Sequence, residues 1–348
     1  MNAPQPLRFW NAATTKLRCV AIATEAPDVK TFHFAAEDGA WFRYQPGQFV
    51  TFALPVPGNT VYRTYTLSST PTRPLRASVT VKAQKDSIGT RWLLDHFQVG
   101  ESLSAVGPAG DFTLPPNPEK LLFISGGSGV TPMLSMTRYL HDLAAEVDIT
   151  YLHFARTPAD LLFTSEIDAL AGFWPALKPR FIVDDPACAN WAGPVGRPSD
   201  ALLRQLCPDL AGRDVFCCGP APFMQAMREA VTTIAGSLDR YREESFQPAA
   251  PKPVESAVTT DSAEIRFTQS GRSASIGGTE TILAAAQAAG IPIPYACEMG
   301  LCGTCQVKKI SGDVVMNHDG GITDDAIAEG YILACCSRPA SGTIEIDL

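Results

Sequence analysis

Three cysteines lie within nine residues near the end of the chain. In "CEMGLCGTC", Cys297 is followed by Cys302 and then by Cys305. Disulfide bonds between such near neighbours would be strained or crowded, and three thiols cannot all pair. Ten cysteines in 348 residues are too few for a disulfide framework, and clustered thiols in a reducing compartment more often bind metal. The cluster therefore indicates a metal site.

The spacing of the thiols separates an iron–sulfur site from a zinc site. Structural zinc usually takes paired C-x2-C motifs, whereas C-x4-C-x2-C with a distant fourth cysteine is the ligand spacing of a [2Fe–2S] cluster. The fourth thiol is found in "YILACCSRP", where Cys335 and Cys336 adjoin. Successive residues of an extended segment point to opposite faces, so we expect only one of these two thiols to face the cluster.

The residues around these thiols predict a small α+β domain. Gly300 and Gly303 allow the backbone to wrap closely and to direct N–H groups at an anionic cluster. Residues 280–290 read as a short helix, and residues 264–271 and 342–348 read as strands. This pattern resembles a plant-type ferredoxin domain of the β-grasp fold over residues 259–348. In that family an "LAC" segment supplies the fourth ligand, so the resemblance implies Cys335.

A segment rich in proline and alanine precedes this domain. Residues 246–258 offer little apolar surface to bury and predict a semi-extended linker. The cluster domain is thus expected to be a tethered module.

A glycine-rich turn lies in the middle of the chain, in "KLLFISGGSGVTPM". An apolar strand over 121–124 leads into Gly126, Gly127 and Gly129, and a helical pattern begins at Pro132. Such a turn allows a diphosphate to approach the N–H groups at a helix start, although it matches neither G-x-G-x-x-G nor a Walker A loop. Further strands at 148–156 and from 214 predict a parallel sheet, with Gly219 at a carboxyl end. We expect an α/β nucleotide domain over 116–245.

The first third of the chain is rich in alternating strands. They predict an antiparallel β-barrel over 16–115, after an N-terminal extension over 1–15. One of them, "RTYTLSS", places Arg63, Tyr65, Thr66 and Ser69 along one segment.

Four motifs occur in the order found in one known superfamily. "RTYTLSS", "SGGSGVTPM", "FCCGPAPFM" and "CEMGLCGTC" resemble the ferredoxin-NADP reductase superfamily with a C-terminal ferredoxin domain. Within it the chain looks most like reductases that serve Rieske-type monooxygenases, such as those demethylating glycine betaine or related quaternary amines. It also resembles the reductase of hybrid-cluster protein.

The resemblance implies a role for each matching residue. Thr66 would hydrogen-bond the flavin N5 edge and Cys218 would stand near the nicotinamide, so these two are the predicted catalytic residues. The remaining flavin contacts would come from Arg63, Tyr65, Ser69, Val81, Lys82, Ser87, Gly89 and Thr90, with FAD expected and FMN as the alternative. The pyridine nucleotide would lie against Gly127, Gly129, Val130, Thr131 and Gly219. The cluster ligands would be Cys297, Cys302, Cys305 and Cys335.

The order of the electron carriers follows from what each can accept. A nicotinamide donates two electrons as a hydride and a [2Fe–2S] cluster takes one, so a flavin must stand between them. We expect NADH as donor, with NADPH as the alternative because Arg156 would suit a 2′-phosphate. The expected acceptor is the oxygenase component of a monooxygenase. The alternatives are hybrid-cluster protein and, in another class, a non-catalytic redox-sensing or electron-distributing subunit.

Charge and hydropathy limit the classes of partner that we expect. No run approaches the roughly 18 apolar residues of a membrane span, and the chain does not open on a secretory signal, so we expect a cytoplasmic protein with neither a membrane nor nucleic acid as partner. From Asp261 onward eleven acidic and five basic residues contribute −6 of the net charge of −8. An acidic ferredoxin face is therefore the expected docking surface, with candidates Glu298, Asp319, Asp324 and Asp325.

Overall fold

A computed structural model describes residues 7–12, 14–84, 86–186, 190–246, 262–277, 280–295, 298, 300, 302–318 and 321–348, with Asp324 described by its main chain alone. Cys297, Asp319 and residues 247–258 of the predicted linker lie outside these ranges. The chain forms two compact units, Met1–Phe49 with Tyr65–Gln247 and Val50–Thr64 with Pro248–Leu348.

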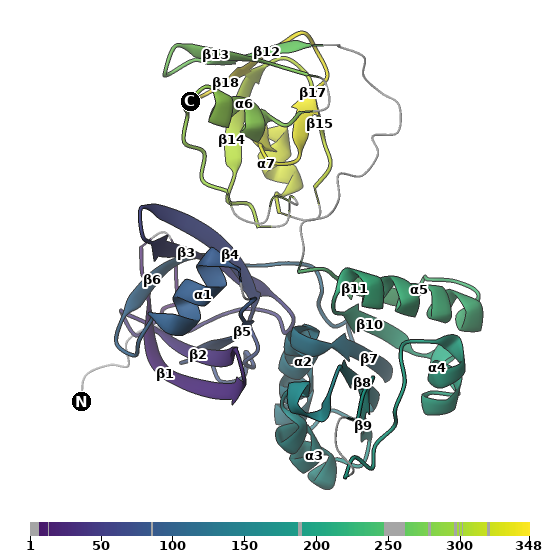
Figure 1. Cartoon of the computed structure of the whole chain (residues 1–348). Coiled ribbons are helices and arrows are strands. Elements are labelled where there is room, and N and C mark those ends of the chain that lie inside the picture. The colour runs from purple at the N-terminus through teal and green to yellow at the C-terminus, as the bar shows by residue number, and fades with distance from the viewer. Residues whose placement is uncertain are drawn as a thin grey trace. The chain divides into compact units, whose positions relative to one another are not determined.

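Six strands of the N-terminal third form a sheet in the order β4-β3-β6-β1-β2-β5 (Figure 1). Their bounds are β1 (Leu17–Ala26), β2 (Val29–Ala36), β3 (Phe49–Val56), β4 (Asn59–Thr66), β5 (Ala77–Lys82) and β6 (Ser102–Ala109), and helix α1 (Ile88–Asp95) follows β5. β1 pairs antiparallel with β2 and β6, and β2 with β5. An isolated bridge from Leu67 to Val79 joins the residues after β4 to β5 at the other end of the sheet. The predicted antiparallel domain is confirmed, and β6 is a strand that the sequence patterns did not indicate.

The nucleotide domain is a parallel sheet in the order β11-β10-β7-β8-β9, with helices on both faces (Figure 1). Its central strands β7 and β8 are rich in apolar residues and buried over most of their length, which is typical of strands covered on both sides. Helices α2 and α3 pack on one face and α4 and α5 on the other. The strands are β7 (Lys120–Gly126), β8 (Asp148–Ala155), β9 (Leu177–Val183), β10 (Asp214–Cys218) and β11 (Tyr241–Glu244), and the helices are α2 (Val130–Asp142), α3 (Thr164–Phe173), α4 (Asp200–Leu206) and α5 (Ala221–Ala235).

The C-terminal domain is a mixed sheet in the order β13-β12-β18-β14-β16, beside a two-stranded sheet of β15 and β17. β12 and β18 run parallel, and the other paired strands run antiparallel. The predicted helix forms as α6, where the Thr281 hydroxyl accepts from the N–H of Ala284 at 3.2 Å and caps the first turn. The elements are β12 (Ala263–Phe267), β13 (Arg272–Ile276), α6 (Ile282–Ala288), β14 (Gln306–Ser311), β15 (Val314–Met316), α7 (Asp324–Ala328), β16 (Tyr331–Leu333), β17 (Ser337–Pro339) and β18 (Thr343–Ile346).

The described part of the N-terminal extension lies along the barrel, where Phe9 bridges Trp41 and the Trp10 indole donates to the carbonyl of Thr15 at 2.8 Å. Within the described ranges, none of the helices combines the length and the hydropathy that a membrane crossing requires.

Candidate functional site

Thr66, Glu244 and Cys218 meet where β4, the strand of the predicted flavin motif and here called the flavin strand, approaches the end of the parallel sheet. Thr66 is the last residue of β4, and its hydroxyl donates to Glu244 Oε2 at 3.5 Å. Glu244 ends β11 and lies opposite Cys218, which ends β10. The fold thus brings together the two residues predicted for hydride transfer, and it adds a carboxyl group between them.

All three side chains are uncharged at neutral pH. Burial raises the pKa of Glu244 to about 8, and the hydrogen bond from Thr66 offsets part of that increase. Burial, and then the nearby Glu244, raises the pKa of Cys218 well above its usual value. The site therefore offers a neutral carboxylic acid, a hydroxyl and a thiol. A protonated carboxyl can donate a proton or a hydrogen bond, as an ionised one cannot.

No sequence pattern singled out Glu244. β11 is only four residues long, reads "YREE", and stands next to the predicted linker, so it resembles an exposed chain end. The signal that could have found it is the alternation of side chains along a strand, which places Glu243 and Glu244 on opposite faces. Glu243 points toward Tyr241 and Arg228 and bonds both, whereas Glu244 takes the opposite face toward Thr66.

The glycine-rich loop lies against the same strand end. A side chain at Gly129 would place its Cβ 2.2 Å from the carbonyl oxygen of Cys218, so only glycine allows this contact. Gly127 has a φ of +55°, and its missing side chain faces open space where a ligand could approach. The Thr131 hydroxyl donates to the carbonyl of Ser128 at 3.1 Å, and Val130 is fully buried. These residues form a tightly packed turn at the strand end, and nucleotide binding there stays a prediction.

A cavity of about 800 Å³ opens beside this loop. It lies at the carboxyl ends of β7 and β8, where ligands of open parallel sheets bind. Lys82, predicted as a flavin contact, reaches this cavity and lies 3.9 Å from Asp160. Asp184 also lines it and pairs with Arg197 at 3.5 Å. Its other lining residues include Gly126, Gly127, Phe154, Arg156, Pro220 and Phe223.

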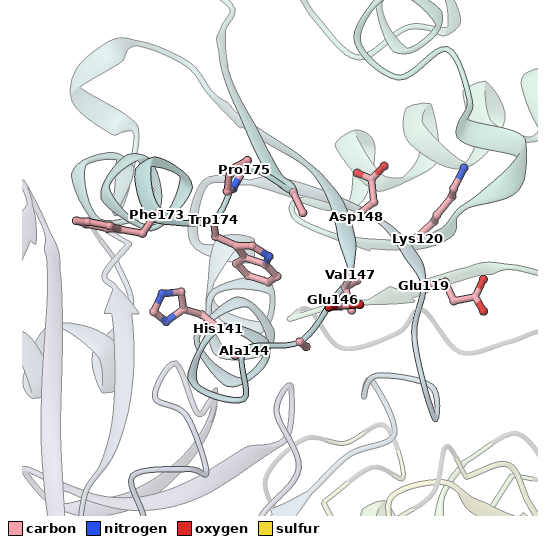
Figure 2. A pocket seen from close by; sticks show the side chains of 12 residues that line it. Glu119, Lys120, His141, Ala144, Glu146, Val147, Asp148, Phe173, Trp174 and Pro175 are labelled. Atoms are coloured by element: carbon pink, nitrogen blue, oxygen red, sulfur yellow. The ribbon is translucent and has the colours of Figure 1, made fainter.

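A second hollow of about 630 Å³ lies at the opposite ends of the parallel strands, where β7 and β8 begin (Figure 2). It is lined by Lys120 and Asp148 at the starts of β7 and β8, by His141 in α2 and by Trp174 after α3. Because it faces the amino ends of the strands, it is not the expected nucleotide site.

The residues predicted to hold the flavin differ in their surroundings. Thr90, in the first turn of α1, has a buried hydroxyl with no hydrogen-bond partner among the described residues, which suits a phosphate oxygen. Ser87 stands at the start of α1 and makes no capping bond from its side chain, so the helix start can receive an anion. The residues present therefore fit an FAD pyrophosphate. Gly89 and Val81 are buried, Tyr65 is half-buried, and the Arg63 guanidinium donates to the carbonyl of Tyr62 at 2.7 Å.

Ser69 forms hydrogen bonds within its own domain. Its hydroxyl accepts from the N–H of Ser78 at 2.8 Å and lies 2.8 Å from the hydroxyl of Tyr44. These bonds hold Ser69 inside the barrel framework.

Three of the four predicted cluster ligands lie within the described residues. Cys302, Cys305 and Cys335 are all buried, and the N–H of Cys335 lies 3.4 Å from Cys305 Sγ. The Cys336 thiol instead lies 3.6 Å from the carbonyl of Leu333. In the described part, no three potential ligands are gathered closely enough to hold a metal ion, and Cys297 lies outside it. The donor set of buried thiols nevertheless fits an iron–sulfur cluster.

The glycines of this loop adopt backbone conformations that other residues avoid. Gly300 and Gly303 both have a φ of +71°. A Cβ at Gly300 would lie 2.8 Å from Cys336 Sγ, and one at Gly303 would lie 2.8 Å from the carbonyl oxygen of Gly321. At these two positions the backbone is packed too closely to admit a residue with a side chain.

The chain matches three families in succession. Residues 16–114 match the oxidoreductase FAD-binding domain, residues 123–229 the oxidoreductase NAD-binding domain, and residues 266–340 the 2Fe-2S iron-sulfur cluster binding domain.

Curated relatives match over nearly the whole chain. The stachydrine N-demethylase reductase subunit of Rhizobium meliloti is 45% identical over 97% of this chain and 98% of its own length. The glycine betaine monooxygenase reductase subunit of Chromohalobacter salexigens is 40% identical over 97% of this chain and 96% of its own. Phthalate dioxygenase reductase has a similar structure, with a TM-score of 0.61 and 25% identity over 97% and 98% of the two chains. The chain therefore belongs to the ferredoxin-NADP reductase superfamily, in the family of iron–sulfur flavoprotein reductase subunits of Rieske-type monooxygenases.

Proposed function

We propose that this chain delivers electrons from NADH to the oxygenase component of a Rieske-type monooxygenase that demethylates a quaternary amine. The family supplies the FAD, NAD and [2Fe–2S] domains and an oxygenase as electron acceptor. The quaternary-amine substrate rests on the two curated relatives above, whose names state stachydrine and glycine betaine. That substrate would bind the oxygenase rather than this chain.

The single observation that carries the hydride-transfer step is the meeting of Thr66, Glu244 and Cys218. When bound, FAD accepts a hydride from NADH and releases its electrons singly to the cluster. The chain's own residues would orient the reacting partners: Thr66 by a hydrogen bond from its hydroxyl, and Cys218 by packing against the nicotinamide. Glu244, neutral at pH 7, would offer a hydrogen-bond donor there without placing a negative charge in the site.

The nucleotide cavity favours NADH over NADPH. Asp184 and Asp160 both line it, and a carboxylate accepts hydrogen bonds from ribose hydroxyls but repels a 2′-phosphate. Arg197 pairs with Asp184, so the negative charge of Asp184 is partly offset. Arg156 is the opposing feature, because its exposed guanidinium lines the same cavity. The ratio of kcat/KM for NADH to that for NADPH, measured with wild type and Asp184→Asn, tests the preference, which the variant should reduce.

We also propose that the oxygenase docks on the acidic ferredoxin domain. Glu298 and Asp325 are exposed there, and the domain carries most of the net charge. Opposite charges speed short-lived encounters at low salt, and screening over about 10 Å at 0.1 M weakens them. The double variant Glu298→Lys, Asp325→Lys should slow electron delivery to the oxygenase and flatten its salt dependence. Asp313→Lys, an exposed acid at the other end of β14 from Cys305, is the matched control.

The overall proposal is tested by turnover of the purified chain with candidate oxygenases while NADH consumption is followed. Product formation coupled to NADH oxidation with a quaternary-amine oxygenase would support it. Turnover with hybrid-cluster protein and with none of the oxygenases would show that hybrid-cluster protein, and not an oxygenase, is the electron acceptor. Failure to reduce added cytochrome c with NADH would indicate a silent electron-distributing subunit.

A further inference from the structure

Helix α2 carries a polar stripe on a face that does not pack on the parallel sheet. Its apolar residues, among them Met133 and Leu140, are buried in the core beneath it. Ser135, Arg138 and Asp142 follow one another at spacings of three and four residues, which places them on one side of a helix. Ser135 is nevertheless fully buried, so this side of the helix is covered by another part of the chain.

The stripe bonds the segment that follows the flavin motif. The Ser135 hydroxyl donates to the carbonyl of Ser69 at 2.6 Å, and Arg138 Nη1 donates to the carbonyl of Ser68 at 2.7 Å. These carbonyls belong to consecutive residues, and Ser68 lies two residues after Thr66. Asp142 then binds the Thr72 hydroxyl and accepts from Arg73 Nη2 at 2.7 Å. Each polar residue of the stripe therefore contacts the barrel between residues 68 and 73.

Arg138 is held in one orientation by a second partner. Its Nε and Nη2 donate to the two carboxylate oxygens of Glu166 in α3, each at 2.7 Å. A bidentate pair of this kind fixes the plane of the guanidinium and leaves Nη1 aimed at Ser68. The side chain of Arg138 is only 20% exposed, so the bond to Ser68 competes little with water.

The other end of α2 is attached to the predicted hydride site. The helix starts at Val130, directly after Gly129, whose backbone lies against the carbonyl of Cys218. On the barrel side, the N–H of Leu67 bonds the carbonyl of Gln48 at 2.9 Å and that of Ser68 bonds the carbonyl of Ser78 at 2.8 Å. One rigid helix thus connects the strand that carries Thr66 with the strand end that carries Cys218.

We propose that Arg138, assisted by Ser135, is a positioning residue that sets the separation of flavin and nicotinamide by tying α2 to the carbonyls of Ser68 and Ser69. The inference rests on the proposed function, because it assumes that Thr66 and Cys218 face the two reacting rings. Hydride transfer is sensitive to such placement, since a misplacement of about 1 Å can cost on the order of 100-fold in rate. In this role Arg138 would act through the carbonyl of Ser68, in the segment that follows β4, and not by contact with either ring.

The test is anaerobic stopped-flow reduction of the bound flavin by NADH in the purified full-length protein. Arg138→Ala should lower the limiting rate of flavin reduction by about tenfold or more, while the NADH concentration giving half of that rate changes little. The primary isotope effect with 4-deuterated NADH should change, because the donor–acceptor distance changes. Arg138→Lys, which keeps the charge but not the bidentate fork, should restore part of the rate.

Two further variants make the result decisive. Ser135→Ala removes one hydrogen bond from a buried site and should lower the limiting rate by about fivefold without loss of flavin. Arg240→Ala is the matched control, because Arg240 bonds the carbonyl of Gly212 at 3.0 Å and pairs with Asp214 inside the nucleotide domain alone. It should leave the limiting rate and the isotope effect unchanged.

Each outcome has a distinct meaning. If Arg138→Ala and Ser135→Ala retain flavin and reduce it at the wild-type rate with the wild-type isotope effect, the inference is wrong. If Arg138→Ala loses flavin, the inference is tested with Ser135→Ala alone. A wild-type rate of flavin reduction and a wild-type isotope effect in that variant would then contradict it. A wild-type protein whose flavin NADH does not reduce would instead contradict the proposed function.

Discussion

The hydroxyl of Thr66 lies 3.5 Å from a carboxyl oxygen of Glu244, and Glu244 lies opposite Cys218 in the parallel sheet. This contact joins the flavin strand to the end of the nucleotide sheet. Because burial raises the pKa of Glu244 to about 8, the carboxyl group is neutral at pH 7 and ionises just above it. The charge of the proposed hydride site therefore changes within an accessible pH range.

Glu244→Gln should remove a pH dependence from flavin reduction. In the wild type, the limiting rate with NADH should change through an ionisation near pH 8, where Glu244 becomes a carboxylate. Glutamine stays neutral and still accepts a hydrogen bond from Thr66, so the variant should keep the low-pH rate across the range. Stopped-flow rates between pH 6 and 9 check this, and an unchanged inflection in the variant would assign it to another group.

The same substitution should change how stability varies with pH. The folded-state pKa of about 8 lies above the ordinary value of 4.5, so the folded chain binds a proton that the unfolded chain has lost between these values. The free energy of unfolding should therefore fall as pH rises through this window, and Glu244→Gln should not show this loss. The difference in melting temperature between variant and wild type, followed from pH 5 to 8.5, should grow in favour of the variant. A constant difference would contradict the raised pKa.

Thr66 should act through its hydroxyl. Thr66→Ala should lower the limiting rate of flavin reduction by roughly fivefold, about the value of one hydrogen bond, while Thr66→Ser should stay close to wild type. The bond from Thr66 lowers the pKa of Glu244, so its loss should also move the ionisation to higher pH. Rate profiles of both variants measure the two effects together. Equal rates in the alanine and serine variants would show that the hydroxyl is not used.

Cys218 should contribute to hydride transfer more than to nucleotide binding. Burial keeps its thiol protonated, so the role we propose for it is packing against the nicotinamide rather than nucleophilic attack. Cys218→Ala should slow flavin reduction by about tenfold and change the dissociation constant of NAD⁺ by less than about threefold, because misplacement costs rate more than affinity. Titration of flavin absorbance with NAD⁺, beside the kinetics, separates the two. Equal losses would mean that Cys218 is only a core residue. Its neighbour Cys217, on the other face of the strand, provides Cys217→Ala as control.

The adjacent thiols of the ferredoxin domain should differ in their effect on the cluster. Cys335→Ala should abolish the cluster while NADH still reduces the flavin, because the N–H of Cys335 lies beside Cys305 Sγ. Cys336→Ala should retain two irons per chain, because the Cys336 thiol lies near the carbonyl of Leu333. Iron content and the EPR signal of the reduced protein measure both variants. The reverse pattern would move the fourth ligand by one residue.

The sequence by itself predicted the order of the modules, which the family matches confirm, and it supplied the residues proposed to hold their cofactors. Local spacing carries that information: C-x4-C-x2-C predicts the cluster, a strand followed by Gly126, Gly127 and Gly129 predicts the nucleotide loop, and alternating apolar residues predict the barrel strands. Each of these signals lies within a short stretch of chain, so it can be read without knowing the fold. The family matches and the parallel sheet agree with them.

Tertiary structure alone decided which distant residues share the site. Glu244 reads as an exposed charge beside a linker, and only the register of β11 against β10 places it between Thr66 and Cys218. The polar stripe of α2 could be read from its spacing, but its partners are the main-chain carbonyls of Ser68 and Ser69, and carbonyl groups leave no trace in a sequence pattern. The pKa of Glu244 depends in the same way on burial, which is a property of the packed chain and not of the residue type.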